Sequence, residues 1–250
     1  MSNPAGVIAV TGGTQGIGRA IAELAFERGH AVSVCSRSAR DPSLPAGISH
    51  VKADVRKREE MDRFVQSVKE QWGRLDIFIN SAGISQWKAL NALDEPFVSE
   101  LIETNVLGTL WGCAAAAARM EEGGVIVNVS SLAGKRGSAN NSAYCAAKFA
   151  VNGITQALAK ELGSRGIRVN AVCPVYVRTE KILAALAAPA SPAARQGVEP
   201  YLKSFAASQT ALGRLPSARE VAEVALFLAS PSASAITGQC INVDCGTLPQ

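Results

Sequence analysis

The 250-residue sequence predicts an α/β fold with a doubly wound, seven-stranded, mostly parallel sheet and helices on both faces. Short β-branched runs alternate with helical segments along the chain, and most of these runs are apolar at nearly every position. Such runs are typical of parallel strands covered on both faces. A glycine-rich turn follows the first run and opens a helical segment. No internal repeat or linker divides the sequence, so we expect residues 1–250 to form a single domain.

The elements follow in order from this pattern. The apolar runs predict strands at residues 7–11, 31–35, 48–52, 75–80, 125–130, 168–172 and 240–243. The segments between them predict helices at residues 16–28, 56–72, 96–121, 143–165 and 218–229.

One stretch interrupts the alternation. Residues 184–194 are rich in alanine and proline, and residues 198–210 follow before the last helix. Ligands of such sheets bind beyond the carboxyl ends of the strands, where this stretch begins. We therefore expect an insertion at about residues 180–212 that acts as a mobile lid over a substrate. A surface helix–loop–helix without a gating role is the alternative.

Composition excludes several classes of protein. Hydrophobic residues make up 48% and charged residues 18%, as in a globular chain, and the net charge of +4 comes without any Lys/Arg block. We expect no nucleic-acid face. No apolar stretch of about 18 residues and no signal-peptide pattern is present, so we expect no membrane segment. Six cysteines without a CxxC pair and only two histidines argue against a metal site, and reduced thiols fit the cytoplasm.

The glycine-rich turn reads TGGTQGIG over residues 11–18. Glycines allow a tight turn and close backbone approach, and a helix N-terminus offers amide donors to a phosphate. The spacing differs from the general G-x-G-x-x-G fingerprint, but its place between strand and helix predicts a Rossmann-type dinucleotide site. The residues of the turn that we expect to bind the cofactor are Gly12, Thr14, Gln15, Gly16, Ile17 and Gly18.

The end of the second predicted strand bears on which dinucleotide binds. A cofactor with a free ribose 2′-hydroxyl usually meets an acidic residue there. This sequence instead has Ser36-Arg37-Ser38, with Arg40 close behind. A guanidinium suits a 2′-phosphate, and Ser36 or Ser38 can donate a further bond. We therefore expect the protein to prefer NADP(H), with NAD(H) as a possible cofactor. The alternative is that Arg37 is a solvated arginine in a loop and contacts no cofactor.

The loops after the third and fourth predicted strands reach the same crevice. Asp54 and Val55 follow one strand, and the sequence NSAG ends the other at residues 80–83. Small residues let the backbone approach the adenosine, and Asp54 can accept a bond from the adenine amine. We expect Asp54, Val55, Asn80, Ala82 and Gly83 to bind the cofactor, although each segment alone is typical of an ordinary turn.

Tyr144 and Lys148 lie four residues apart on a predicted helix, so phenol and ammonium share one face. A nearby cation favours phenolate, and we expect it to lower the pKa of Tyr144 from its usual value near 10. The tyrosine can then act as general acid or base toward a carbonyl or alcohol oxygen. Ser131 ends the preceding strand, and its hydroxyl can hold the same oxygen.

Together, these motifs resemble the classical short-chain dehydrogenase/reductase family over nearly the whole chain. The matches are the glycine turn, Asp54, Asn80–Gly83, Asn105, Ser131, Tyr144-xxx-Lys148 and a Pro174 segment ending in Thr179. The resemblance implies a catalytic tetrad of Asn105, Ser131, Tyr144 and Lys148. Tyr144 would transfer the proton, Ser131 would orient the oxygen and Lys148 would bind ribose hydroxyls. Asn105 would hold a water, and Val177 and Thr179 would meet the carboxamide.

The resemblance also implies an activity. We expect an NADP(H)-dependent oxidoreductase, a ketoreductase that interconverts a ketone and a secondary alcohol by hydride transfer. A 3-oxoacyl carrier-protein reductase and an NAD-dependent alcohol or diol dehydrogenase are the alternatives, and a catalytically inactive dinucleotide sensor is disfavoured by the intact tetrad. Family members commonly form homotetramers. The alanine-rich predicted helices 96–121 and 143–165 suit such packing, with a homodimer as the alternative.

Two departures from the family pattern bear on the pocket. Ser81 replaces a common asparagine, and Val175 stands where glycine usually follows Pro174. Valine disfavours positive φ and adds bulk, so we expect a changed loop path and a reshaped pocket. Mostly apolar walls suit a medium-sized ketone or secondary alcohol, with Trp87 as a core or interface aromatic in the alternative. The substrate-binding residues that we expect are Ser85, Trp87, Leu132, Asn141, Val175 and Tyr176.

Overall fold

The computed structural model describes residues 4–249 and contains a seven-stranded sheet. Every neighbouring pair of strands is parallel, so the predicted "mostly parallel" sheet is parallel throughout. The order across the sheet is β3-β2-β1-β4-β5-β6-β7. The strands are β1 (Val7–Thr11), β2 (Ala31–Ser36), β3 (Ser49–Lys52), β4 (Ile77–Asn80), β5 (Val125–Val129), β6 (Arg168–Pro174) and β7 (Cys240–Val243).

The strand order contains one reversal. From β1 the chain moves outward through β2 to β3, then returns to β4 on the other side of β1 and continues to β7. In a doubly wound sheet such a switch point opens a crevice beyond the carboxyl ends of the two central strands. The loops after β1 and β4, which carry the glycine turn and residues 81–83, therefore meet.

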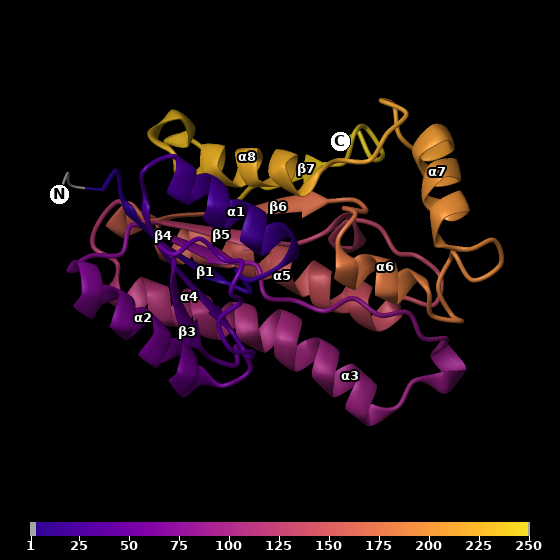
Figure 1. Cartoon of the computed structure of the whole chain (residues 1–250), viewed down its shortest axis with the longest axis horizontal. Coiled ribbons are helices and arrows are strands. Elements are labelled where there is room, and N and C mark those ends of the chain that lie inside the picture. Colours follow the sequence, from indigo (N-terminus) through magenta and orange to yellow (C-terminus); the bar gives the residue numbers. More distant parts are fainter. Residues whose placement is uncertain (1–3, 250) are drawn as a thin grey trace.

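Helices cover both faces of the sheet (Figure 1). α1 and α8 pack on one face around Ile8 and Val10, whereas α2, α4 and α5 pack on the other around Phe64 and Phe78. The two clusters alternate along β1, because successive strand residues point to opposite faces. The helices are α1 (Gly16–Glu27), α2 (Arg58–Trp72), α3 (Glu95–Ile102), α4 (Gly108–Arg119), α5 (Ser142–Glu161), α6 (Glu180–Leu186), α7 (Val198–Gln209) and α8 (Ala218–Ala229).

The helix predicted over residues 96–121 is helical without a break from Glu95 to Arg119, but it is not α-helical throughout. α3 and α4 are joined by a π-helical turn at Glu103–Leu107. Within it, the Asn105 Nδ2 donates to the backbone oxygens of Leu101 and Ile84, both at 3.0 Å. Such turns insert an extra residue and are frequent at functional sites. The helix predicted over 143–165 also ends earlier, at Glu161, with a short 3₁₀ turn after it.

The insertion at residues 180–212 consists of α6, a loop and α7. Leu186, Ala193 and Leu202 of the insertion form a small buried cluster with Trp87. Figure 1 shows α7 at one end of the molecule, away from the two helical layers. The insertion is thus a helix–loop–helix, and its role as a mobile lid stays a prediction.

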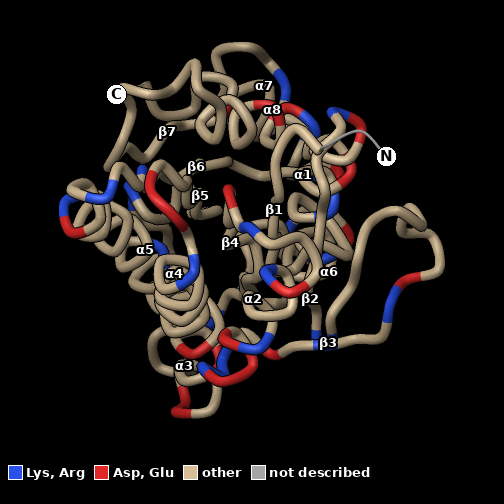
Figure 2. Tube along the Cα trace, turned by 90° about the vertical axis from the view of Figure 1, so that its left-hand side faces the viewer, with Lys and Arg blue, Asp and Glu red and all other residues tan. Residues whose placement is uncertain are grey.

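Charged residues of both signs lie on the outer helices and loops in the view of Figure 2. None of the described helices has the length and apolar character needed to cross a membrane.

Candidate active site

A cavity of about 310 Å³ opens at the carboxyl edge of the sheet. It joins the glycine turn at one end to Tyr144 and Ser131 at the other, and most of the predicted site residues line it. These are Gly12, Gln15, Gly16, Ile17, Gly18, Ala82, Gly83, Ser85, Trp87, Asn105, Ser131, Leu132, Asn141, Tyr144, Lys148, Pro174, Val175, Tyr176, Val177 and Thr179.

The glycine turn is a tight cradle. Gly12 has a φ of +67°, and a Cβ there would lie 2.8 Å from the Cα of Ala82. The Thr11 hydroxyl closes this contact, because its Oγ1 accepts bonds of 3.1 Å from the amides of Ser81 and Ala82. α1 begins with no side-chain cap from Gln15, so its first amides remain available as donors to an anion. The turn therefore fits the pyrophosphate of a dinucleotide.

Six predicted cofactor residues do not line the cavity. They are Thr14, Ser36, Arg37, Asp54, Val55 and Asn80.

The Asn80 side chain lies inside the sheet instead. Its Nδ2 donates to the Asn128 Oδ1 at 2.9 Å, and the Asn128 Nδ2 donates in turn to the Thr155 Oγ1 at 2.9 Å. All three residues are buried. Buried amides need such partners, and this chain ties β4, β5 and α5 together behind the site. The predicted binding of Asn80 to the cofactor therefore cannot involve its side chain.

Two other predicted cofactor contacts already have partners. Arg56 binds the Asp54 carboxylate through its guanidinium, with Nη2 at 2.6 Å, and this hydrogen bond lowers the pKa of Asp54. The Ser36 Oγ lies 2.9 Å from the His50 Nε2. Arg37 is exposed at the end of β2, and it forms no ion pair within residues 4–249.

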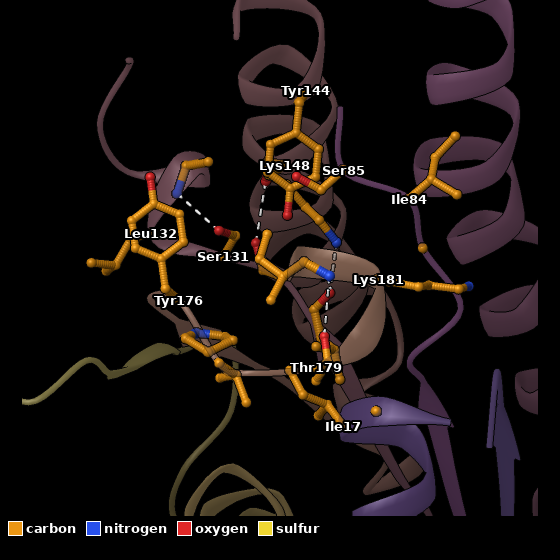
Figure 3. Close-up of a pocket in the computed structure, with 18 of the residues that line it drawn as sticks. Ile17, Ile84, Ser85, Ser131, Leu132, Tyr144, Lys148, Tyr176, Thr179 and Lys181 are labelled. Carbon is orange, nitrogen blue, oxygen red and sulfur yellow. Dashed lines mark hydrogen bonds between the residues drawn. The ribbon is translucent and has the colours of Figure 1, made fainter. Parts of the chain in front are cut away.

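Tyr144 lies in the first turn of α5, and Lys148 lies one turn further along the same face. The Lys148 Nζ is 5.8 Å from the centre of the Tyr144 ring and donates to the Val129 oxygen at 2.9 Å. Ser131 and Ser85, from the loops after β5 and β4, lie near the Tyr144 phenol and line the same cavity. Figure 3 shows these side chains converging at one end of the pocket.

Burial sets the protonation of this pair. It raises the pKa of Tyr144 to about 12, against the smaller opposing effect of the neighbouring Ser131 and Ser85 hydroxyls. It also lowers the pKa of Lys148 to about 8, since only 6% of this residue is exposed. The expected lowering of the Tyr144 pKa is therefore reversed: desolvation of the phenol outweighs the favourable interactions of its anion.

Asn105 holds the loop that carries Ser85. Besides the bond to the Ile84 oxygen, its Oδ1 accepts from the Ile84 amide at 3.3 Å. A Cβ on Gly83 would lie 2.8 Å from that Oδ1 and 3.7 Å from the Lys148 Nζ. Only glycine fits between these two side chains, so the loop passes close to both Asn105 and Lys148.

The substrate end of the cavity has an aromatic wall. Tyr176 packs edge-on against Phe205 and Tyr201, with ring centres 4.9 and 5.8 Å apart, and lies 6.5 Å from Trp87. The Tyr176 and Tyr201 hydroxyls are 3.1 Å apart. Trp87 both belongs to the small buried cluster with Leu186 and Leu202 and lines the cavity, so its contact with a substrate stays a prediction.

Val175 requires no strained backbone. Among the described residues, only Asn140 and Cys245 combine a side chain with positive φ. β6 continues to Pro174, two residues beyond its predicted end, and Val175 follows it into the cavity wall. Val175 is thus accommodated without a positive φ, and its side chain adds bulk to the cavity wall; a changed loop path stays a prediction.

Several cavity residues were missed by the sequence reasoning. For three of them the sequence offered only nearness to a predicted residue. Ser130 directly precedes Ser131, Arg136 lies five residues after it, and Lys181 lies two residues beyond Thr179 in the first turn of α6. The missed residues are Ser81, Val129, Ser130, Ala133, Arg136, Gly137, Ser138, Glu180, Lys181 and Ile182.

All six cysteines are free thiols, and four of them are buried. Burial raises the pKa of Cys35 and Cys113 to about 12, which keeps both protonated. Within residues 4–249, no three His, Cys, Asp or Glu side chains lie close enough together to hold a metal ion.

Known proteins resemble the chain over almost its full length. A family model described as enoyl-(acyl carrier protein) reductase matches residues 12–247. The 3-oxoacyl-(acyl-carrier-protein) reductase FabG of Chlamydia muridarum is 35% identical over 95% of both chains. A diacetyl reductase ((S)-acetoin forming) of Staphylococcus aureus is 37% identical over 96% of both. The ligand-free aldohexose dehydrogenase of Thermoplasma acidophilum superposes with a TM-score of 0.87 at 28% identity, covering 98% of this chain and 97% of that one.

Proposed function

Because the chain belongs to the short-chain dehydrogenase/reductase family of oxidoreductases, we propose that it interconverts a ketone and a secondary alcohol, with Tyr144 as the proton carrier and NADP(H) as the cofactor. One observation carries the proposal: the cavity that begins at the glycine cradle ends where Ser131, Ser85 and Tyr144 present hydroxyls to one another.

The side chains suggest how the proton moves. A bound nicotinamide would supply or accept the hydride. With a pKa of about 12, the Tyr144 phenol is protonated at neutral pH, so it can donate its proton to a carbonyl oxygen as that oxygen gains charge. The Ser131 hydroxyl would hold the same oxygen. The Lys148 ammonium, on the same helical face, would stabilise the phenolate left behind and bind the ribose of the cofactor.

Tyr144→Phe tests the proton step. The variant should bind NADPH normally, because the cradle is untouched, while turnover falls by a factor of hundreds or more. Binding is measured by the change in NADPH fluorescence and turnover by absorbance at saturating cofactor. Turnover within about threefold of wild type would refute the role of Tyr144.

The preference for NADP(H) rests on Arg37. No acidic residue stands at the end of β2, and the exposed guanidinium has no partner within residues 4–249. Arg37→Ala should weaken binding of NADPH roughly tenfold and leave NADH nearly unchanged. Equal losses for both dinucleotides would count against a phosphate contact.

The relatives include enzymes of small and of large substrates, so the class of ketone is a separate question. The aromatic wall around Tyr176 and the 37% identical diacetyl reductase favour a small or medium-sized apolar ketone. The carrier-protein reductase remains the rival, on the strength of its 35% identity. An acidic carrier would need basic residues near the helix that precedes β5, where Arg119 ends α4. Asp62 already binds the Arg119 guanidinium at 3.1 Å, which disfavours docking there. Kinetics with an acyl-carrier substrate against small cyclic and aryl ketones would decide between them.

We also propose a homotetramer. α4 is largely alanine on its surface, and Phe149 leaves 48% of its residue area exposed on α5, as at a helix-packing face. Equilibrium sedimentation showing only monomer would refute this assembly.

A further inference from the structure

Lys181 reaches the cofactor crevice from the insertion and not from the sheet. It lies in the first turn of α6 and lines the cavity. The start of α6 is pressed against the glycine turn: Gly16 has a φ of +56°, and a Cβ there would lie 3.3 Å from the Thr179 Cγ2. In Figure 3 the Lys181 side chain extends away from Tyr144 and Ser131. Lys181 therefore lies at the cofactor end of the cavity, near the glycine turn.

The charge on Lys181 is uncompensated. No acidic side chain within residues 4–249 pairs with its ammonium, whereas exposed cations elsewhere, such as Arg178 and Arg214, bind a glutamate. Partial burial lowers the pKa of Lys181, and the nearby positive charge of Arg37 lowers it further. The geometry places both cations beside the glycine turn. Arg37 directly follows β2, and the Cys35 oxygen of that strand accepts a bond of 2.8 Å from the Gly12 amide. Lys181 follows Thr179, which packs against Gly16. Two like charges from separate elements therefore flank the same turn.

Like charges brought together at a cavity repel each other unless an anion lies between them. We propose that Lys181 and Arg37 bind one phosphate group from opposite sides, and that this group is the 2′-phosphate of NADP(H). This inference rests on the proposed use of a dinucleotide. It makes Lys181 a specificity-determining residue and gives the insertion a direct contact with the feature that distinguishes NADP(H) from NAD(H).

The pyrophosphate is the competing anion, because the glycine turn beside Thr179 is suited to it. The two sources differ in one respect: NADH carries the pyrophosphate but not the 2′-phosphate. Adenosine 2′,5′-bisphosphate carries the 2′-phosphate without a pyrophosphate or a nicotinamide, and AMP lacks it. Binding of NADPH, NADH, adenosine 2′,5′-bisphosphate and AMP therefore separates a contact with the 2′-phosphate from a contact with the pyrophosphate.

The experiment measures dissociation constants of all four probes for wild type, Lys181→Met and Lys181→Arg. Lys181→Met should weaken NADPH and adenosine 2′,5′-bisphosphate roughly tenfold, the loss of one charge-assisted bond, and change NADH and AMP less than about twofold. Lys181→Arg should retain most of the NADPH affinity. Lys203→Met removes an exposed lysine of α7 and should change none of the constants.

Parallel loss of NADPH and NADH affinity in Lys181→Met would overturn the proposal in favour of the pyrophosphate, and no loss of either would overturn it outright. The double variant with Arg37→Ala should lose less than the product of the two single losses, since both side chains would hold one group. Failure of the parent proposal looks different: wild type would then bind NADPH no more tightly than NADH, or Arg37→Ala would affect both equally.

Discussion

Lys148→Met should stabilise the protein while it abolishes catalysis. Burial lowers the pKa of Lys148 from 10.5 to about 8, so at neutral pH the fold holds a charge in surroundings that disfavour it. The difference between these pKa values corresponds to about 3 kcal/mol of free energy. Methionine keeps the volume of the lysine stem without the charge. It also loses the bond to the Val129 oxygen, which costs about 1 kcal/mol, so a net gain of roughly 2 kcal/mol at pH 7 remains.

The sign of the pH dependence follows from proton binding. Between pH 8 and 10.5 the folded protein carries fewer protons on Lys148 than the unfolded chain does, so the free energy of unfolding of wild type rises with pH across this window. The depressed pKa thus contributes stability at high pH that is lost as the pH falls through 8. Methionine does not titrate. The advantage of the variant should therefore shrink by about 3 kcal/mol as the pH rises from 7 to 10.5.

Urea denaturation at pH 7, 8.5 and 10, followed by tryptophan fluorescence, measures both quantities. Lys160→Met is the matched control, because Lys160 lies on the same helix with an exposed side chain, and its effect should be near zero at every pH. A Lys148→Met variant that is less stable than wild type at pH 7, or whose advantage does not change with pH, would refute the assignment of a buried, charged ammonium.

Two further variants test the cradle and the pocket. Gly12→Ala should weaken the binding of NADPH and NADH equally, by more than about tenfold, because the alanine would have a φ of +67° and its Cβ would clash with the Ala82 Cα. Gly153→Ala is the control: nothing lies within 4 Å of a Cβ added there, so this variant should bind both dinucleotides normally. Val175→Gly should lower the free energy of unfolding by about 1 kcal/mol in urea, since glycine gains freedom in the unfolded chain, and should lower the KM for bulky aryl ketones more than for small ones. An unchanged ratio of KM values would exclude Val175 from the pocket wall.

The periodicity of the apolar residues was sufficient to predict every strand to within two residues, because strands buried on both faces have few compatible sequences. The π-helical turn was not predictable. It arises where Asn105 bonds to Ile84, a residue of a different loop, and no pattern within residues 96–121 records that contact. Local composition there is that of a continuous helix.

The candidate site divides in the same way. The sequence alone determined that Tyr144 and Lys148 share one face of a helix, since their four-residue spacing is a local property. The tertiary structure decided their protonation, because desolvation depends on what surrounds a side chain. It also placed the Asn80 amide against Asn128 inside the sheet, and it placed Lys181 of α6 and Arg37, which follows β2, beside the same glycine turn. Contacts between segments distant in the chain leave no local signature, and they set the electrostatics of this crevice.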